Sequence, residues 1–219
     1  MRAMILAAGK GERMMPLTKN TPKPLIKVKD IALIEHSINT LKKANITNIV
    51  INISYLAEQI KTHLGDGSNF GVSITYSDES EGALETAGGI IKALPLLGGE
   101  PFIVINSDVL CNYDLSQLKL PIDSLANLLL IDNPAHNPEG DFSLKNNRVI
   151  TKKDKTYTFS GIGIYHPDFF KNYLHTQDKL PLYPLLTEAI ANNQLSGEHY
   201  TGYWQDIGTP ERLKLTNNT

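Results

Sequence analysis

The chain has 219 residues, of which 41% are hydrophobic and 20% charged, with a net charge of −2 at pH 7. This is ordinary usage for a globular protein with one substantial core, and it argues against a nucleic-acid-binding surface. No apolar run is long enough to predict a membrane span, Cys111 has no partner for an internal disulfide, and the N-terminus lacks the pattern of a signal peptide. We therefore expect a cytoplasmic protein, monomeric or a small homo-oligomer, that acts on small molecules.

Apolar runs of strand length alternate with amphipathic segments in the first half of the chain. This alternation is typical of an α/β fold, in which helices flank a mostly parallel sheet. Pro95 is expected to end the third helix, because proline cannot donate the hydrogen bond that a helix interior requires. The predicted strands are 3–8, 48–53, 72–76 and 102–105, and the predicted helices are 31–44, 55–64 and 85–94.

The second half continues the pattern with more turn signals. Asn146 and Asn147 stand between two short strand-like runs and predict a hairpin. Gly161 and Gly163 interrupt a longer strand-like stretch. The predicted strands are 127–131, 141–144, 148–150 and 156–165, and the predicted helices are 185–192 and 210–215. Neither repeats nor a linker-like segment break the chain, so we expect a single domain.

A glycine-containing loop directly follows the first strand. Gly9 and Gly11 leave backbone N–H groups uncovered, which suits the binding of a phosphate or the edge of a base. Arg13 adds a planar fork of donors, and Lys23 adds a compact positive charge. A Gly-x-Gly after a strand is common, and this spacing matches neither the dinucleotide fingerprint nor the Walker loop. Together these residues predict a nucleoside triphosphate site.

Two aspartates from distant parts of the chain are candidate metal ligands. Asp108 directly follows strand 102–105, at the sheet edge where α/β proteins bind ligands, although an aspartate there can also simply stabilise a turn. Thr209 and Pro210 explain a helix start as its cap and first residue, and they leave Asp206 without a structural role. Because Mg²⁺ prefers oxygen ligands and commonly takes one or two carboxylates, the pair predicts a Mg²⁺ site.

Glycines and one amide mark possible contacts with a base and a sugar. Gly88 and Gly89 lie in a predicted helix, where they allow either a close approach to a flat base or close packing on the sheet. Asn106 is placed to donate to a sugar hydroxyl. Gly140 and Gly161 mark either a ligand or a β-bulge, and the pattern alone does not separate the two.

The string Leu6-Ala-Ala-Gly-Lys-Gly-Glu-Arg-Met-Met-Pro-Leu-Thr18, followed by Pro22-Lys23-Pro24, resembles the signature of the sugar-1-phosphate nucleotidyltransferases. The resemblance covers essentially the whole chain. It implies one Rossmann-like domain over residues 1–219, with a mostly parallel mixed sheet flanked by helices. It also implies a nucleotidyltransferase reaction in which Asp108 and Asp206 hold Mg²⁺.

The family's functional positions carry over onto this sequence. Catalytic roles are implied for Arg13, Lys23 and Asp108, and sugar contacts for Asn106, Gly140 and Gly161. Nucleotide contacts are implied for Ala7, Gly9, Gly11, Glu12, Arg13, Lys23, Leu84 and Gly88. Two positions depart from the family pattern, because Ser107 and Glu85 stand where glycine is common.

Further strings, including Thr158-Phe-Ser-Gly161 and Ser196-Gly-Glu-His-Tyr200, resemble those of short bacterial members that join UTP to N-acetylmuramic acid 1-phosphate. This implies UTP and that sugar phosphate as substrates, in the recycling of cell-wall peptidoglycan. Other pairs stay open, among them mannose 1-phosphate with GTP and glucose 1-phosphate with UTP or TTP. A non-catalytic nucleotide sensor is a further alternative. An oxidoreductase is disfavoured by the glycine spacing.

Overall fold

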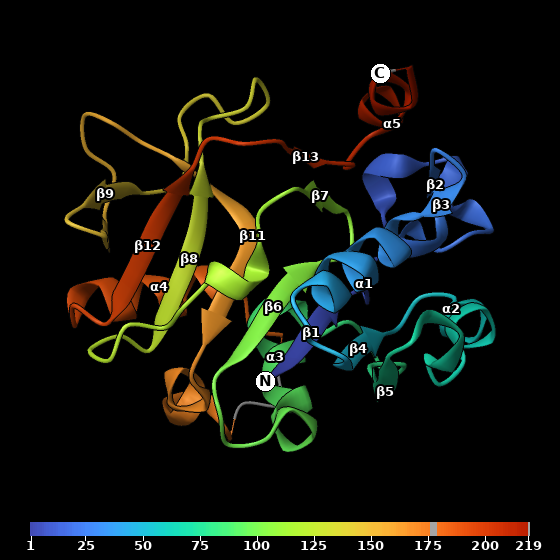
Figure 1. The fold of residues 1–219 in the computed structure, drawn as a ribbon, viewed down its shortest axis with the longest axis horizontal. Coiled ribbons are helices and arrows are strands. Elements are labelled where there is room, and N and C mark those ends of the chain that lie inside the picture. The colour runs from blue at the N-terminus through green and yellow to red at the C-terminus, as the bar shows by residue number, and fades with distance from the viewer. Residues whose placement is uncertain (176–178, 219) are drawn as a thin grey trace.

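The computed structural model of the chain, which describes residues 1–175 and 179–218, is built around a nine-stranded sheet. The strand order is β5-β4-β1-β6-β11-β8-β12-β10-β9, and helices cover the sheet as Figure 1 shows. One half of the sheet is entirely parallel, with strands β1 (Arg2–Leu6), β4 (Asn48–Ile53), β5 (Ser73–Asp78) and β6 (Phe102–Asn106). The expected mixed, mostly parallel sheet is confirmed.

The other half of the sheet is mixed. Strand β11 runs antiparallel to both of its neighbours, whereas β8 and β12 are parallel to each other. The strands of this half are β8 (Ala126–Ile131), β9 (Ser143–Lys145), β10 (Arg148–Ile150), β11 (Thr158–Tyr165) and β12 (Leu195–Tyr200). The predicted hairpin is confirmed, since β9 and β10 pair across Asn146 and Asn147, whose φ angles of 49° and 58° suit a tight hairpin turn.

Both faces of the sheet are covered, which explains the unbroken apolar runs of the strands. Ile49 and Ile51 point into one core with helices α1 (Leu33–Lys43) and α2 (Ala57–Leu64). Val50 points into the opposite core with α3 (Glu85–Leu97) and α4 (Leu182–Ala191). Strand residues therefore alternate between two cores that share one sheet.

The expected bounds of several helices are wrong, and for α1 and α3 the structure shows the reason. Helix α1 begins at Leu33 because residues 31–32 form β3 (Ile31–Ala32), which pairs with β2 (Lys27–Val28). Helix α3 continues through Pro95 to Leu97. Proline lies in the last turn there and removes only one hydrogen bond, while Leu97 stays 2% exposed in the core.

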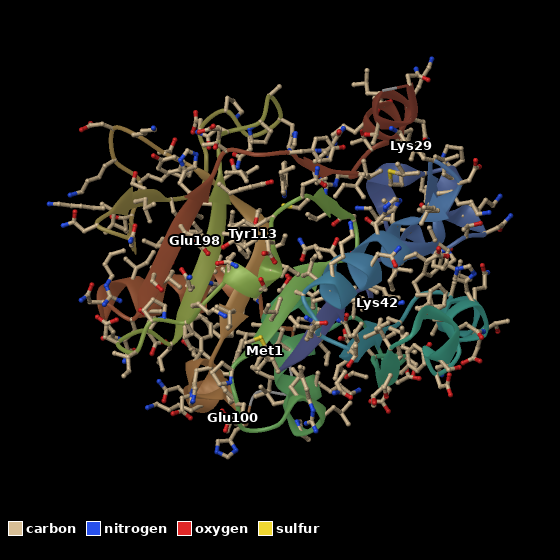
Figure 2. All side chains as sticks on the ribbon, viewed as in Figure 1. Met1, Lys29, Lys42, Glu100, Tyr113 and Glu198 are labelled. Atoms are coloured by element: carbon tan, nitrogen blue, oxygen red, sulfur yellow. The ribbon has the colours of Figure 1, made fainter. Side chains whose placement is uncertain are left out.

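Strand β12 was not expected from the sequence, because Gly197 and Glu198 break its apolar pattern. A Cβ on Gly197 would lie 2.7 Å from Val149 Cγ2, so the glycine lets the neighbouring strand approach. Glu198 accepts a hydrogen bond of 2.8 Å from the Tyr113 hydroxyl, and Figure 2 shows the two side chains together. Burial and this bond raise the pKa of Tyr113, so the hydroxyl stays a donor to a higher pH than that of a free tyrosine.

A small second sheet lies over the carboxyl ends of the central strands. Strand β7 (Val109–Cys111) pairs antiparallel with β13 (Trp204–Asp206), and helix α5 (Pro210–Asn218) follows along the upper edge in Figure 1. Neither short strand was expected. In the described part of the chain, no helix combines the length and the apolar character that crossing a membrane requires.

Candidate active site

The glycine-containing loop after β1 has a shape that requires glycine at one position. Gly11 has a φ of 65°, and a Cβ there would lie 2.9 Å from Lys23 Cβ and 3.0 Å from Thr18 Cγ2. Thr18 Oγ1 donates to the Gly11 carbonyl at 2.9 Å and closes the loop. A side chain at position 11 would therefore disturb the placement of Lys23.

A cavity of about 110 Å³ opens at the carboxyl ends of β1 and β6. A Cβ on Gly9 would meet nothing within 4 Å, so the space beside this part of the lining is open. The cavity brings together both ends of the signature motif and the residues after β6. It is lined by Leu6, Ala7, Gly9, Lys23, Pro24, Asn106, Ser107 and Asp108.

Lys23 and Asp108 form an ion pair within this cavity. Lys23 Nζ contacts Asp108 Oδ2, and the two side chains are 14% and 19% exposed. Partial burial weakens solvent screening of the pair. Asp108 Oδ1 makes no hydrogen bond or ion pair with the described residues, so the carboxylate keeps one oxygen available.

Pairing of β7 with β13 brings Asp206 to Asp108. The Ile207 N–H donates to the Asp108 carbonyl at 2.8 Å, and Asp206 pairs with Val109. The two aspartates, far apart in sequence, thus lie on adjoining backbone segments. The Asp206 carboxylate belongs to β13, and the Asp108 carboxylate belongs to the turn between β6 and β7.

The expectation that Asp206 has no structural role is wrong. Arg212 Nη1 on α5 donates to Asp206 Oδ1 at 2.7 Å, and His136 Nε2 lies 3.2 Å from the same oxygen. Asp206 Oδ2 has no hydrogen bond or ion pair among the described residues. A Cβ on Gly208 would lie 2.1 Å from Arg212 Nη2, so glycine at this position gives the arginine its path to Asp206.

The donor chemistry of the two aspartates fits Mg²⁺. Each carboxylate has one oxygen bound to a cationic side chain and one without a protein partner. Within residues 1–175 and 179–218, no group of three or more histidine, cysteine, aspartate or glutamate side chains is placed to hold a metal ion. Mg²⁺ needs no such group, because it completes its coordination with water and substrate phosphates.

Two of the residues expected to bind the nucleotide lie outside the cavity. Glu12 and Arg13 are exposed on a short 3₁₀ turn, Glu12–Met14. Neither lines the cavity. Arg13 is therefore available to a ligand from the solvent side.

Three of the residues expected to contact the nucleotide lie on two separate backbone segments. The Ala7 N–H donates to Asn52 Oδ1 at 2.8 Å, and the Leu84 N–H donates to Glu79 Oε2 at 3.0 Å. Gly88 is buried, and its N–H donates to the Leu180 carbonyl at 3.1 Å. Sequence reasoning missed Asn52 and Glu79, because a polar residue at a strand end gives no signal of its partner.

The backbone conformation at Glu85 shows why glycine is common at this position in the family. Its φ of 64° lies in the left-handed region that favours glycine. The backbone shape typical of glycine is thus kept by a non-glycine residue at a cost in strain.

Two of the residues expected to contact the sugar, Asn106 and Gly161, lie together in the structure. Gly161 has a φ of 79°, and a Cβ there would lie 2.5 Å from Asn106 Nδ2. It lies where the pairing of β11 with β8 shifts register, between Phe159 and Gly163. The bulge interpretation therefore holds, and the bulge lies beside a cavity residue.

Gly140 has a different position, in the loop 132–141. Its φ is 61°, and a Cβ would lie 2.5 Å from Asn133 Oδ1, so it shapes this loop rather than lining the cavity. Asn137 Nδ2 donates to Asp141 Oδ1 at 3.0 Å, and Asp141 Oδ2 accepts from the Phe159 N–H at 2.8 Å. The loop so held carries His136 to Asp206, a placement that a lone histidine in sequence does not signal.

Cys111 offers no nucleophile. It pairs with Trp204 across the small sheet. Burial raises the pKa of its thiol, so the group stays protonated at neutral pH.

Comparison with known proteins adds to this geometry. The family model described as "Nucleotidyl transferase" matches residues 2–218. The chain is 48% identical to the N-acetylmuramate alpha-1-phosphate uridylyltransferase of Neisseria meningitidis serogroup B, across 98% of this chain and 96% of that protein. It is 31% identical to the protein of the same name from Caulobacter vibrioides, across 95% and 92% of the two chains.

The fold is also similar to that of solved structures. A crystal structure from Bacillus anthracis, assigned as a glucose-1-phosphate thymidylyltransferase in complex with sucrose, superposes with a TM-score of 0.87. The two chains are 25% identical, and the match covers 100% of this chain and 94% of the other.

Proposed function

Because this chain belongs to the nucleotidyl transferase family, we propose that it joins UTP and N-acetylmuramic acid 1-phosphate to UDP-N-acetylmuramic acid, releasing pyrophosphate. The observation that carries the substrates is the 48% identity to the Neisseria enzyme over 98% of the chain. The geometry of the cavity supports the class of reaction. This activity would return muramic acid to the precursors of the cell wall.

The reaction is an in-line displacement at phosphorus. A phosphate oxygen of the sugar 1-phosphate forms a bond to the α-phosphorus of UTP, and the bond from that phosphorus to the α–β bridging oxygen breaks. Pyrophosphate leaves with that oxygen. The attacking phosphate is already anionic, so the protein needs no covalent intermediate, and its task is positioning and charge neutralisation.

Lys23 is assigned to the phosphates around the reacting centre. It lines the cavity and forms an ion pair with Asp108, and its ammonium group can donate a hydrogen bond to an incoming phosphate oxygen. Arg13, exposed on the neighbouring turn, is assigned to the leaving pyrophosphate. Gly9 and Gly11 allow the loop backbone to come close to the nucleotide.

Mg²⁺ is assigned to Asp108 and Asp206, whose unpartnered oxygens provide hard ligands. When bound, the ion would neutralise charge on the reacting phosphates. Arg212 keeps the other oxygen of Asp206 occupied and so orients this carboxylate.

The remaining assignments follow the two sides of the cavity. Asn106, Gly140 and Gly161 are assigned to the sugar, Gly140 acting through the loop 132–141. Nucleotide contacts are assigned to Ala7, Gly9, Gly11, Glu12, Arg13, Lys23, Leu84 and Gly88. We infer that residues 1–219 act as one domain, because the two cores share a single sheet, and as a monomer or a small homo-oligomer.

Pyrophosphate release tests the proposal. UTP, GTP, CTP and TTP would each be paired with the 1-phosphates of N-acetylmuramic acid, N-acetylglucosamine, glucose and mannose in the presence of Mg²⁺. We expect release with UTP and the muramic substrate. Release of pyrophosphate with another pair only would support the reaction type and contradict the proposed substrates. No release with any pair would contradict the proposed activity and favour a nucleotide sensor.

A further inference from the structure

Glu79 is a buried carboxylate that the proposed reaction does not use. It follows β5 and is 1% exposed. Its Oε1 accepts from Asn52 Nδ2 at 2.7 Å, and its Oε2 accepts from the Leu84 N–H at 3.0 Å. No ion pair to Glu79 occurs among the described residues, so these donors are what makes its burial tolerable.

Asn52 connects Glu79 to Ala7, which lies between β1 and the glycine-containing loop. It lies at the end of β4, is 3% exposed, and its Oδ1 accepts from the Ala7 N–H at 2.8 Å. The order β5-β4-β1 places the three strand ends next to one another. The Asn52–Glu79 bridge therefore links Ala7, which lines the cavity, to Leu84, which precedes α3.

Helix α3 leaves room for the bridge. A Cβ on Gly89 would lie 2.6 Å from Glu79 Oε1 and 2.9 Å from Asn52 Nδ2. A glycine inside a helix weakens it relative to alanine, and here the missing methyl group is what lets the two polar side chains lie against the helix. The ends of β1, β4 and β5 and the surface of α3 therefore all lie close to the bridge.

We propose that the Asn52–Glu79 bridge positions the base of the nucleotide by setting the spacing between Ala7 and Leu84. This inference rests on the proposed function, which assigns both backbone segments to the nucleotide. An apolar pair of similar shape would fill the same space but would leave the N–H groups of Ala7 and Leu84 without acceptors. Asn52 and Glu79 are positioning residues, because they act on the base through these two segments.

The first variant is Glu79→Gln. Asn52 Nδ2 and the Leu84 N–H each use a different oxygen of Glu79, and glutamine replaces one of these oxygens with an NH2 group that donates, so one of the two bonds is lost. We expect KM for UTP to rise about tenfold, the effect of losing one buried hydrogen bond, while KM for the sugar 1-phosphate stays unchanged. The preference for UTP over CTP should fall. Loss of folded protein alone would lower kcat and leave both KM values in place.

The double variant Asn52→Asp with Glu79→Gln is the rescue. The carboxylate at position 52 accepts from the Ala7 N–H and from the new amide, whose oxygen accepts from the Leu84 N–H. All three bonds and the net charge are restored, so we expect KM for UTP to return to within about twofold of the wild type.

Ser77→Ala is the matched control, since Ser77 is buried at 4% on β5 but lies outside the bridge. Its KM for UTP should not change. If Glu79→Gln does not fold, Gly89→Ala adds a methyl group against both members of the bridge without removing either, and it should raise KM for UTP.

An unchanged KM for UTP in folded Glu79→Gln or Gly89→Ala protein would overturn the inference, while the muramic reaction of the wild type would still support the proposed function. If the wild type instead uses another nucleotide, the proposed function fails. The same variants then test the bridge with that nucleotide.

Discussion

The parallel half of the sheet and the segments beyond it hold the polar groups of the candidate site in different ways. In the parallel half, Asn52 lies near the end of β4, Asp108 follows β6 closely, and the bridge from Asn52 to Glu79 is almost fully buried. Outside the parallel half, Asp206 is placed by the small sheet and His136 by the loop 132–141 that follows β8.

The proposed nucleotide side and the proposed sugar side therefore differ in how firmly their residues are fixed. Buried hydrogen bonds between neighbouring strand ends permit little movement, so the proposed nucleotide side is preorganised. The proposed sugar side depends on partly exposed groups, with the His136 side chain 41% exposed. We therefore expect substitutions in the two halves to affect UTP and the sugar 1-phosphate separately.

The largest effects are expected where the two halves meet, at the paired aspartates. Asp108→Asn and Asp206→Asn each remove a charged ligand assigned to Mg²⁺, and each should lower kcat on the order of 10²-fold or more, as should Lys23→Ala. Steady-state rates across a Mg²⁺ titration measure this, with thermal melts confirming the fold. Near-normal turnover in folded Asp206→Asn protein would contradict the assignment of Asp206 to Mg²⁺ and leave Asp108 as the assigned ligand.

A moderate effect is expected for His136→Gln. The imidazole Nε2 lies 3.2 Å from Asp206 Oδ1, so in the proposed reaction it would border a sugar 1-phosphate at the assigned metal site. KM for the sugar 1-phosphate should rise about fivefold, the effect of one modest hydrogen bond, with KM for UTP unchanged.

His199→Gln is the control for this substitution. His199 pairs with Asp132, at the start of the same loop, and Nε2 lies 2.9 Å from its carboxylate. Its loss should leave both KM values as in the wild type. Equal effects of the two histidine substitutions would show that the loop responds as a whole and that His136 has no special contact.

The smallest effect concerns stability. Glu85→Gly relieves the strain of a φ of 64°, which outweighs the extra chain entropy of glycine, so unfolding free energy should rise by about 0.5–1 kcal/mol. Denaturant unfolding measures this change. Glu81→Gly, at a neighbouring exposed position without a positive φ, should instead lower stability, and a gain there would contradict the strain explanation.

Much of the fold was predictable, because strands that are buried on both faces of a sheet appear in the sequence as unbroken apolar runs. The strand at 48–53 matches β4 at both ends, and the Asn146-Asn147 turn matches the hairpin. Errors arose where packing overrides local preference. Helix α3 tolerates Pro95 because its last turn is anchored in the core, and β12 tolerates Gly197 because Val149 packs closely against it.

Local patterns alone identified the glycine-containing loop, Lys23 and the two aspartates as candidates, because each lies beside a strand or helix boundary visible in the sequence. Tertiary structure alone decided the partners of these residues. The bonds of Arg212 and His136 to Asp206, and the bridge from Ala7 through Asn52 and Glu79 to Leu84, join separate elements of the chain. Such bonds form only when packing brings distant segments together, and no periodicity or spacing encodes them.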